Sequence, residues 1–72
     1  MKTPPLGQVI RKRRKELGVD QRTLSELSGV SIHTISDIES GKANPTLSTV
    51  ESLLQVLGLE LKVQAQKPGE PR

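Results

Sequence analysis

Apolar residues recur every three or four positions from Leu6 to Leu57, which predicts a series of short amphipathic helices. The chain is organised around the stretch from Asp20 to Gly41, which predicts two helices joined by a tight turn at Ser28-Gly29-Val30. Short polar residues are placed to cap the starts of these helices, and glycines to end them. The capping residues are Asp20 and Ser31, and the terminating glycines are Gly29 and Gly41.

The two helices have a common apolar side and one distinctly polar face. The inner side carries Leu24, Leu27, Val30, Ile35 and Ile38 at helical spacing. The opposite face of the second helix is short-chained and polar, with His33, Ser36, Asp37 and Ser40 pointing away and Ile32 on the flank. This pattern is typical of a helix-turn-helix, in which the second helix enters a major groove of DNA.

An earlier helix is predicted from about Pro5 to Leu17, because proline is tolerated in an opening turn and Gly18 follows. Its stripe comprises Leu6, Val9, Ile10, Arg13 and Leu17, with Arg14 at the edge, so one arginine must lean toward the core. A buried charge needs a partner, and Glu39 on the inward flank of the second helix is the candidate for Arg14. We therefore expect a structural ion pair between Arg14 and Glu39.

The C-terminal part of the chain changes its period. A helix is predicted from Thr46 to about Leu57, with a stripe of Leu47, Val50, Leu53, Leu54 and Leu57, and Gly58 terminates it. Leu59, Leu61 and Val63 then alternate with polar residues, which predicts a strand over residues 59–65. A lone strand leaves backbone groups unpaired, which favours pairing with the same strand of a second copy. A frayed tail, or a segment lying on its own helices, would fit the same residues.

Composition narrows the possible functions. The 72 residues suffice for one small domain, and the absence of aromatic residues removes the stacking platforms of single-strand binders. With no cysteine and one histidine, we expect no disulfide, no thiol nucleophile and no metal site. No apolar run is long enough for a membrane span or a signal peptide, so we expect a soluble, cytoplasmic protein without a membrane partner.

The charge is unevenly distributed. Eleven Lys and Arg against eight Asp and Glu give a net charge of +3, and six basic residues precede Glu16, the first acid. Such clusters are often solvated surfaces, and Arg11, Lys12 and Lys15 fit either that role or phosphate contacts. The position of the cluster beside a helix-turn-helix favours a nucleic-acid partner.

The residues around the turn carry a family resemblance. Gln21 opens the first helix of the pair, SELSGVS crosses the turn, and IESGKANPTLSTVESLLQVLG follows. Over residues 6–58 this order resembles the Xre-type helix-turn-helix family of phage repressors, Cro proteins and bacterial antitoxins. The resemblance implies an all-α, lambda-repressor-like bundle of four to five short helices that binds operator DNA as a homodimer. The organisation expected is an N-terminal arm (1–5), this DNA-binding domain (6–58), the dimerisation strand (59–65) and a disordered tail (66–72).

A narrower resemblance covers the segment LGLELKVQ, which looks like HipB-type antitoxins. In those proteins a strand after the last helix pairs between subunits, and the dimer represses its own operon and binds a HipA-like kinase toxin. The resemblance implies that Leu59, Leu61 and Val63 form the dimer strand.

The Xre-type resemblance also implies the DNA contacts. Gln21 matches a position that contacts phosphate, and Lys42 and Asn44 match positions that grip the backbone, although surface capping and a solvated turn are the simpler interpretations. The start of the second helix matches the base-contacting region. The full set of implied contacts is Gln21, Arg22, Ser31, Ile32, His33, Thr34, Ser36, Asp37, Lys42 and Asn44.

The chemistry of this face suits some base contacts better than others. Ile32 fits a thymine methyl group, His33 and Ser36 fit base-edge hydrogen bonds, and Asp37 fits either a cytosine amino group or a surface role. Ser31 and Thr34 fit phosphate contacts or helix capping. Without Arg or Lys the face lacks the common bidentate contact to guanine, so shape readout should weigh more.

The leading hypothesis is a sequence-specific repressor of double-stranded DNA that occupies a promoter as a homodimer. Its two recognition helices would lie about 34 Å apart, so the operator should be an inverted repeat. No cofactor and no small-molecule effector is expected. The alternative is an antitoxin whose main role is to neutralise a kinase-like toxin. An enzyme is disfavoured, because no catalytic triad, metal cluster or phosphate loop is present in the sequence and His33 lacks a nucleophile beside it.

Overall fold

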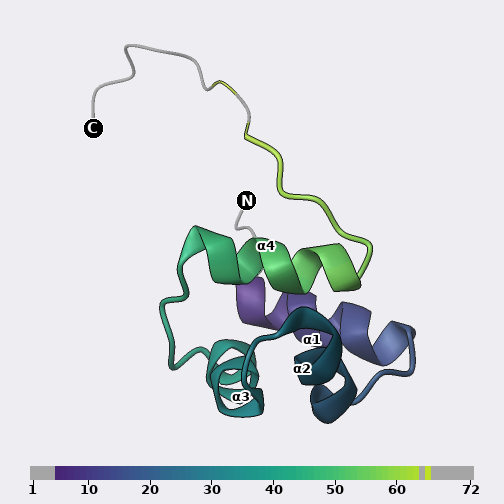
Figure 1. Cartoon of the computed structure of the whole chain (residues 1–72). Coiled ribbons are helices and arrows are strands. Elements are labelled where there is room, and N and C mark those ends of the chain that lie inside the picture. The colour runs from purple at the N-terminus through teal and green to yellow at the C-terminus, as the bar shows by residue number, and fades with distance from the viewer. Residues whose placement is uncertain (1–4, 64, 66–72) are drawn as a thin grey trace.

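The computed structural model describes residues 5–63 and 65, and this part of the chain forms four helices and no strand. The helices are α1 (Leu6–Glu16), α2 (Gln21–Ser28), α3 (Ile32–Ser40) and α4 (Leu47–Val56). Helices α2 and α3 form the helix-turn-helix, and α1 and α4 pack against it (Figure 1). The predicted all-α bundle is confirmed. Most of the predicted N-terminal arm and the tail at residues 66–72 lie outside the described residues.

The helix ends lie within one residue of the predicted ones, because the capping residues act as expected. The side chains of Asp20, Ser31 and Thr46 accept hydrogen bonds from backbone N–H groups three residues later, at 2.8, 3.1 and 3.1 Å. The bond from the Thr23 N–H lowers the pKa of Asp20. Gly29 and Gly41 end α2 and α3 in the left-handed conformation, with φ of 78° and 83°.

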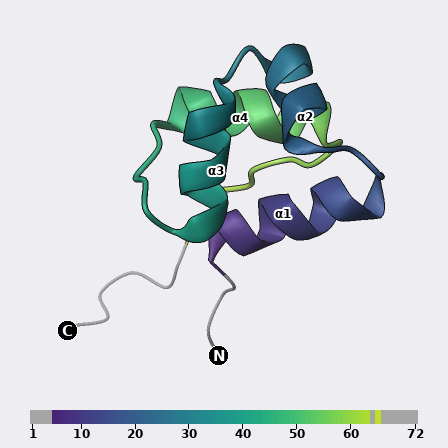
Figure 2. The same ribbon diagram turned by 90° about the horizontal axis from the view of Figure 1, so that it is seen from below.

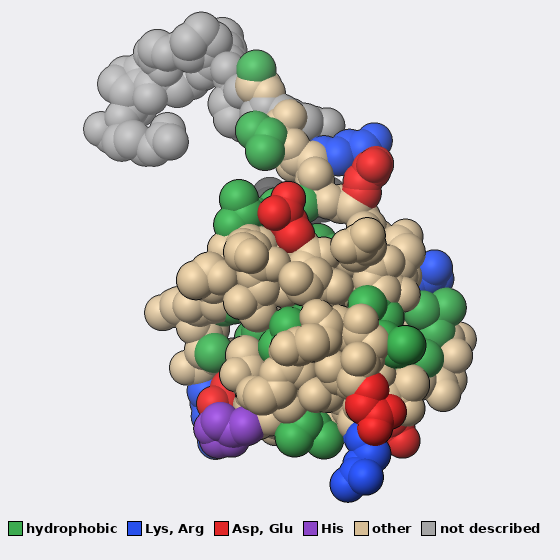
Figure 3. All heavy atoms as spheres, in the orientation of Figure 1, with side chains coloured by type: hydrophobic (Ala, Val, Ile, Leu, Met, Phe, Trp, Pro, Cys, Tyr) green, Lys and Arg blue, Asp and Glu red, His purple; other side chains and the backbone are tan. Residues whose placement is uncertain are grey.

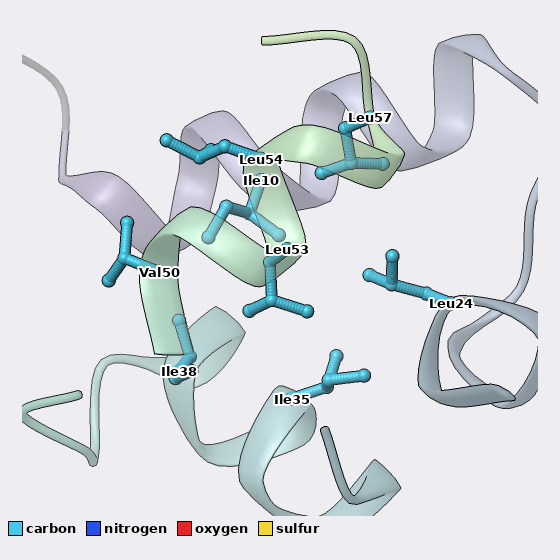
Figure 4. Packing of buried hydrophobic residues seen from close by; sticks show 8 residues of the cluster. All are labelled: Ile10, Leu24, Ile35, Ile38, Val50, Leu53, Leu54 and Leu57. Carbon is cyan, nitrogen blue, oxygen red and sulfur yellow. The ribbon is translucent and has the colours of Figure 1, made fainter. Parts of the chain in front are cut away.

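One apolar core joins all four helices (Figure 4). Each of the predicted stripes supplies its central members to this core, as helical periodicity requires. The buried residues are Ile10, Leu24, Ile35, Ile38, Val50, Leu53, Leu54 and Leu57. Their convergence fixes the position of α3 relative to α1 and α4.

Three leucines that were assigned to the apolar stripes are exposed instead: Leu17, Leu27 and Leu47. Leu27 is the clearest error, because 64% of its surface remains accessible. All three lie in the first or last turn of a helix or just after it. Periodicity indicates which way such a side chain faces, but it does not indicate whether another element covers that side chain.

Helix α1 approaches α3 closely through a glycine. Gly7 is buried, and a Cβ atom at this position would collide with the backbone carbonyl of Ile38 near the end of α3. Of the neighbouring arginines Arg13 and Arg14, the one predicted at the edge of the apolar stripe is the more deeply buried. Arg14 is buried, whereas Arg13 is half-exposed and donates from Nε to the backbone oxygen of Leu57 at 2.9 Å.

The chain turns back at Gly58, and the following segment passes over the outer side of α4 (Figure 1). The N–H of Leu59 donates to the Leu54 oxygen at 2.9 Å, and the Leu59 side chain packs against the core. Residues 60–63 form no strand in the single chain, and a strand requires a second strand to pair with. The dimerisation strand therefore stays a prediction.

Candidate nucleic-acid interface

The turn between α2 and α3 holds the two helices in a fixed arrangement. Leu24 of α2 and Ile35 of α3 are fully buried in the shared core. The turn itself is closed by two bonds, from the Gly29 N–H to the Ser25 oxygen at 2.9 Å and from the Val30 N–H to the Ser28 Oγ at 3.1 Å. The orientation of α3 thus follows from core packing and turn geometry together.

Helix α3 lies in front of α4 when the protein is seen from below (Figure 2). The face of α3 that points away from the core is polar and accessible. Ile32 and Ser36 are exposed, and 85% of the His33 side chain is accessible. Ser31, the capping residue, also donates from its hydroxyl to the Thr34 Oγ1 at 2.9 Å. This bond holds the half-buried Thr34 within the helix cap, whereas Ile32, His33 and Ser36 are the exposed side chains of the first turns.

Asp37 is held from two sides. Its carboxylate lies 3.3 Å from the His33 Nε2, one helical turn earlier. Its backbone oxygen accepts hydrogen bonds from the Lys42 and Ala43 N–H groups at 2.8 and 3.3 Å. These bonds tie the start of the α3–α4 loop to α3, so the exposed Lys42 and Asn44 are presented next to the outer end of that helix.

A buried ion pair links α1 to α3, as the sequence predicts. Only 8% of the Arg14 surface is accessible, and its Nε and Nη2 donate to the two Glu39 carboxylate oxygens at 2.8 and 2.9 Å. The third nitrogen, Nη1, donates to the Val19 oxygen at 2.9 Å. This bidentate geometry satisfies both charges inside the protein.

The same carboxylate reaches the first residue of α2. Gln21 donates from Nε2 to Glu39 Oε1 at 3.1 Å. Burial alone would raise the pKa of Glu39, but the hydrogen bonds from Arg14 and Gln21 outweigh it and leave the pKa below its ordinary value. The bond to Glu39 likewise raises the pKa of Arg14, against the opposing effect of burial. Three helices therefore meet at one charged network.

A hollow of about 210 Å³ lies beside this network. It brings together the start of α2, the outer side of α3 and two basic residues of α1. Its lining residues are Arg11, Arg14, Gln21, Ser36, Glu39 and Ser40. The sequence-predicted contacts Gln21 and Ser36 therefore share one surface, whereas Arg22 lies exposed on α2 and does not line this hollow.

Sequence reasoning missed two features of this region. The bond between Gln21 and Glu39 joins residues 18 positions apart, and no local pattern indicates it. The close approach at Gly7 had a weak signal, because a glycine inside a helical pattern often marks tight packing. Within residues 5–63 and 65, no group of three or more His, Cys, Asp or Glu side chains is placed to hold a metal ion. In the same residues, no helix is long and apolar enough to cross a membrane.

The sequence of this fold matches a known family model, described as helix-turn-helix, over residues 10–64. This chain belongs to the helix-turn-helix family. The predicted Xre-type resemblance is thereby confirmed at the level of the family. The family is one of transcriptional regulators and not a class of enzymes.

Several relatives have similar sequences. The HTH-type transcriptional regulator PuuR of Escherichia coli (strain K12) is 39% identical over 69 residues, and the match covers 92% of this chain. The chain spans only 37% of the length of PuuR. The uncharacterized HTH-type transcriptional regulator y4mF of Sinorhizobium fredii is 37% identical over 73 residues, which cover all of this chain and 93% of y4mF.

A solved structure has the same fold. The restriction-modification controller protein C.AhdI from Aeromonas hydrophila superposes with a TM-score of 0.75 at 32% sequence identity. The superposition covers 78% of this chain and 85% of C.AhdI. The narrower resemblance to HipB-type antitoxins, and a toxin partner, are not tested by these relatives and stay predictions.

Proposed function

We propose that this helix-turn-helix protein is a sequence-specific repressor that binds double-stranded DNA with α3 in the major groove. The observation that supports this role most directly is the exposed polar face of α3, which is held in place by the buried network of Arg14, Glu39 and Gln21. A recognition helix must keep its orientation to read bases, and this network ties it to α1 and α2. Repression follows from occupying a promoter.

The exposed side chains divide into two roles by their chemistry. Ile32, His33 and Ser36 lie on the accessible first turns of α3 and meet base edges. Lys42 and Asn44, in the loop tied to Asp37, meet phosphates on the flanking backbone. Arg22, Ser31, Thr34 and Asp37 complete the proposed DNA surface. Gln21 donates to Glu39 with its amide nitrogen and lines the hollow at the start of α2.

The active form in this proposal is a homodimer. A single α3 of nine residues covers one half-site, and a two-fold dimer places two such helices on successive major grooves, about 34 Å apart. The exposed apolar segment after α4 is the part of the chain that supplies the contact between copies. The operator is then an inverted repeat.

Selection of bound duplexes from a random DNA pool tests this function. The expected result is an enriched inverted repeat with half-sites about one helical turn apart, about 10 base pairs from centre to centre. Selection without enrichment by the purified protein would contradict the proposal. That result would favour the alternative, an antitoxin in which the same apolar segment binds a toxin and DNA binding depends on that partner.

Affinity measurements at several salt concentrations test the location of the interface. Lys42→Ala should weaken binding to the selected duplex and reduce the slope of log K against log salt by about one, since one phosphate contact is lost. The matched control is Lys12→Ala, because the structure places this exposed lysine beside Gln8 and Arg13, outside the proposed DNA surface. If the two variants weakened binding equally, DNA would be attracted by net charge alone, and the proposed location of the interface at Lys42 would be wrong.

A further inference from the structure

The segment from Leu59 to Val63 has exposed apolar side chains on an alternating pattern. Leu59 is anchored on α4 by its N–H bond to the Leu54 oxygen, but 47% of Leu61 and 95% of Val63 are accessible in the single chain. Apolar side chains after α4 stand clear of the helical body in the space-filling view (Figure 3). Between them lie Glu60 and Lys62, whose charged groups approach to 3.9 Å.

Two copies of this segment that run in opposite directions have complementary side chains. The segment runs apolar, acidic, apolar, basic, apolar, so reversal exchanges only the two charges. We propose that this segment pairs antiparallel with the same segment of a second copy, with the two-fold axis at Leu61. Glu60 then lies opposite Lys62 of the partner subunit, and Leu59 lies opposite Val63 of the partner subunit. The inference rests on the proposed dimer and specifies its register.

Several other ways of aligning the two segments are unfavourable, because they bring like charges together or place apolar side chains opposite charged ones. A parallel pair places Glu60 opposite Glu60 of the partner subunit, and like charges directly opposite each other are destabilising. Antiparallel pairs centred on Glu60 or on Lys62 have the same fault. A centre between two residues places apolar side chains opposite charged ones, because the side-chain period of a strand is two. Only the centre at Leu61 pairs Glu60 with Lys62 of the partner subunit and keeps apolar residues opposite apolar residues.

The surface beside the segment fits this register. A hollow of about 330 Å³ is lined by the outer side of α4 and the start of the segment, through Glu51, Leu54, Gln55, Leu59, Glu60 and Leu61. Opposed side chains on paired strands have Cβ atoms about 5 Å apart, so Val63 of the partner subunit reaches Leu59 at the edge of this hollow. A two-stranded ribbon alone is marginal in water, and burial of this valine against α4 adds the apolar contact that the ribbon needs.

Disulfide trapping in the full chain tests the register, because the protein has no cysteine of its own. Leu61→Cys should form a disulfide-linked dimer with itself upon mild oxidation, since this position meets its own copy at the axis. Leu59→Cys alone should not, because the two copies lie about 13 Å apart, four residues along a strand. A mixture of Leu59→Cys and Val63→Cys should cross-link as a heterodimer.

Charge exchange provides a second readout that requires no cysteine. Glu60→Lys and Lys62→Glu should each raise the dimer dissociation constant about tenfold in sedimentation equilibrium, because each creates two like-charged pairs. The double variant Glu60→Lys/Lys62→Glu should restore the wild-type constant. A mixture of the two single variants should form heterodimers in preference to either homodimer, since every pair is then complementary.

The possible failures are distinguishable. Self-cross-linking of Leu59→Cys to the same extent as Leu61→Cys would overturn the antiparallel register in favour of a parallel one. A wild-type dimer that tolerates both single charge changes, with no cross-linking at Leu61→Cys, would place the dimer interface elsewhere and leave the proposed repressor intact. A wild-type chain that stays monomeric at micromolar concentration, with and without the selected DNA, would overturn the register and the dimeric repressor together.

Discussion

Helix α3 and the segment Leu59–Val63 both present side chains to the outside of the protein, and they differ in how they are held. The outer face of α3 is supported within one chain, by a buried core on one side and by the network of Arg14, Glu39 and Gln21 on the other. The segment is anchored at Leu59, whereas Val63 is almost fully exposed. A single chain therefore completes the element proposed to read DNA, but not the element proposed to set the distance between two copies of it.

The largest effect is expected from breaking the network that supports α3. Arg14→Ala leaves Glu39 as a buried carboxylate without its cation, which should lower the free energy of unfolding by about 3–5 kcal/mol. Urea denaturation followed by circular dichroism measures this change.

The control for this prediction is Arg13→Ala, one residue away on the same helix. It removes a half-exposed arginine with a single bond to the Leu57 oxygen, and should lower the free energy of unfolding by only about 1 kcal/mol. If the two substitutions had similar effects, the pair between Arg14 and Glu39 would behave as a surface pair and the support for α3 would lie elsewhere.

The next largest effect concerns the contact between α1 and the end of α3. Gly7→Ala forces a methyl group against the Ile38 carbonyl, and the helices must separate, which should destabilise the fold by about 1–3 kcal/mol. The thermal midpoint in calorimetry measures this change, with Ser52→Ala on α4 as a small-residue control. An unchanged midpoint for Gly7→Ala would mean that the two helices adjust without cost.

The network should also make stability depend on pH. The pKa of Glu39 is lowered in the folded protein, so the unfolded chain binds its proton more readily. The resulting stabilisation is fully present above the ordinary glutamate pKa of about 4.3 and is lost as the pH falls through the lower folded-state value. Unfolding free energies measured from pH 7 to pH 3 should fall more steeply for the wild type than for Glu39→Gln. Parallel curves would contradict the assigned role of Glu39.

The smallest effect on the single chain is expected in the segment after α4. Val63→Ala should change the free energy of unfolding of the monomer by less than about 0.5 kcal/mol, because the side chain is 95% accessible there. The same substitution should weaken self-association, measured by sedimentation equilibrium. A loss of monomer stability without any effect on association would contradict the comparison, because the segment would then be supported within one chain, as α3 is.

Features of the fold that depend on residues within one helical turn could be predicted from the sequence. Features that depend on how distant helices pack could not. Asp20, Ser31 and Thr46 act as caps and Gly29 and Gly41 as stops because these roles depend on residues within one helical turn. The need of a buried arginine for a partner was enough to predict the pair between Arg14 and Glu39. The exposure of Leu27 was missed, since it depends on the length and angle of neighbouring helices.

The candidate site was also predictable only in its local features. The polar face of α3 follows from helical periodicity, so His33 and Ser36 are exposed as expected. The link from Gln21 to Glu39 required the tertiary structure, because three helices must converge before it forms. Which bases the face reads depends on a second molecule, and neither the sequence nor the fold of one chain contains that information.

The most direct test of the central proposal is to repeat the DNA selection with His33→Ala. His33 is 85% accessible in its side chain, so its removal should leave the fold intact, as Gln8→Ala on α1 should in a matched control. We expect the wild type and Gln8→Ala to enrich the same inverted repeat. The His33→Ala variant should lose preference at one base pair in each half-site, at positions related by the two-fold axis. An unchanged preference at every position, or a change in one half-site only, would contradict the proposal that two copies of α3 read the operator.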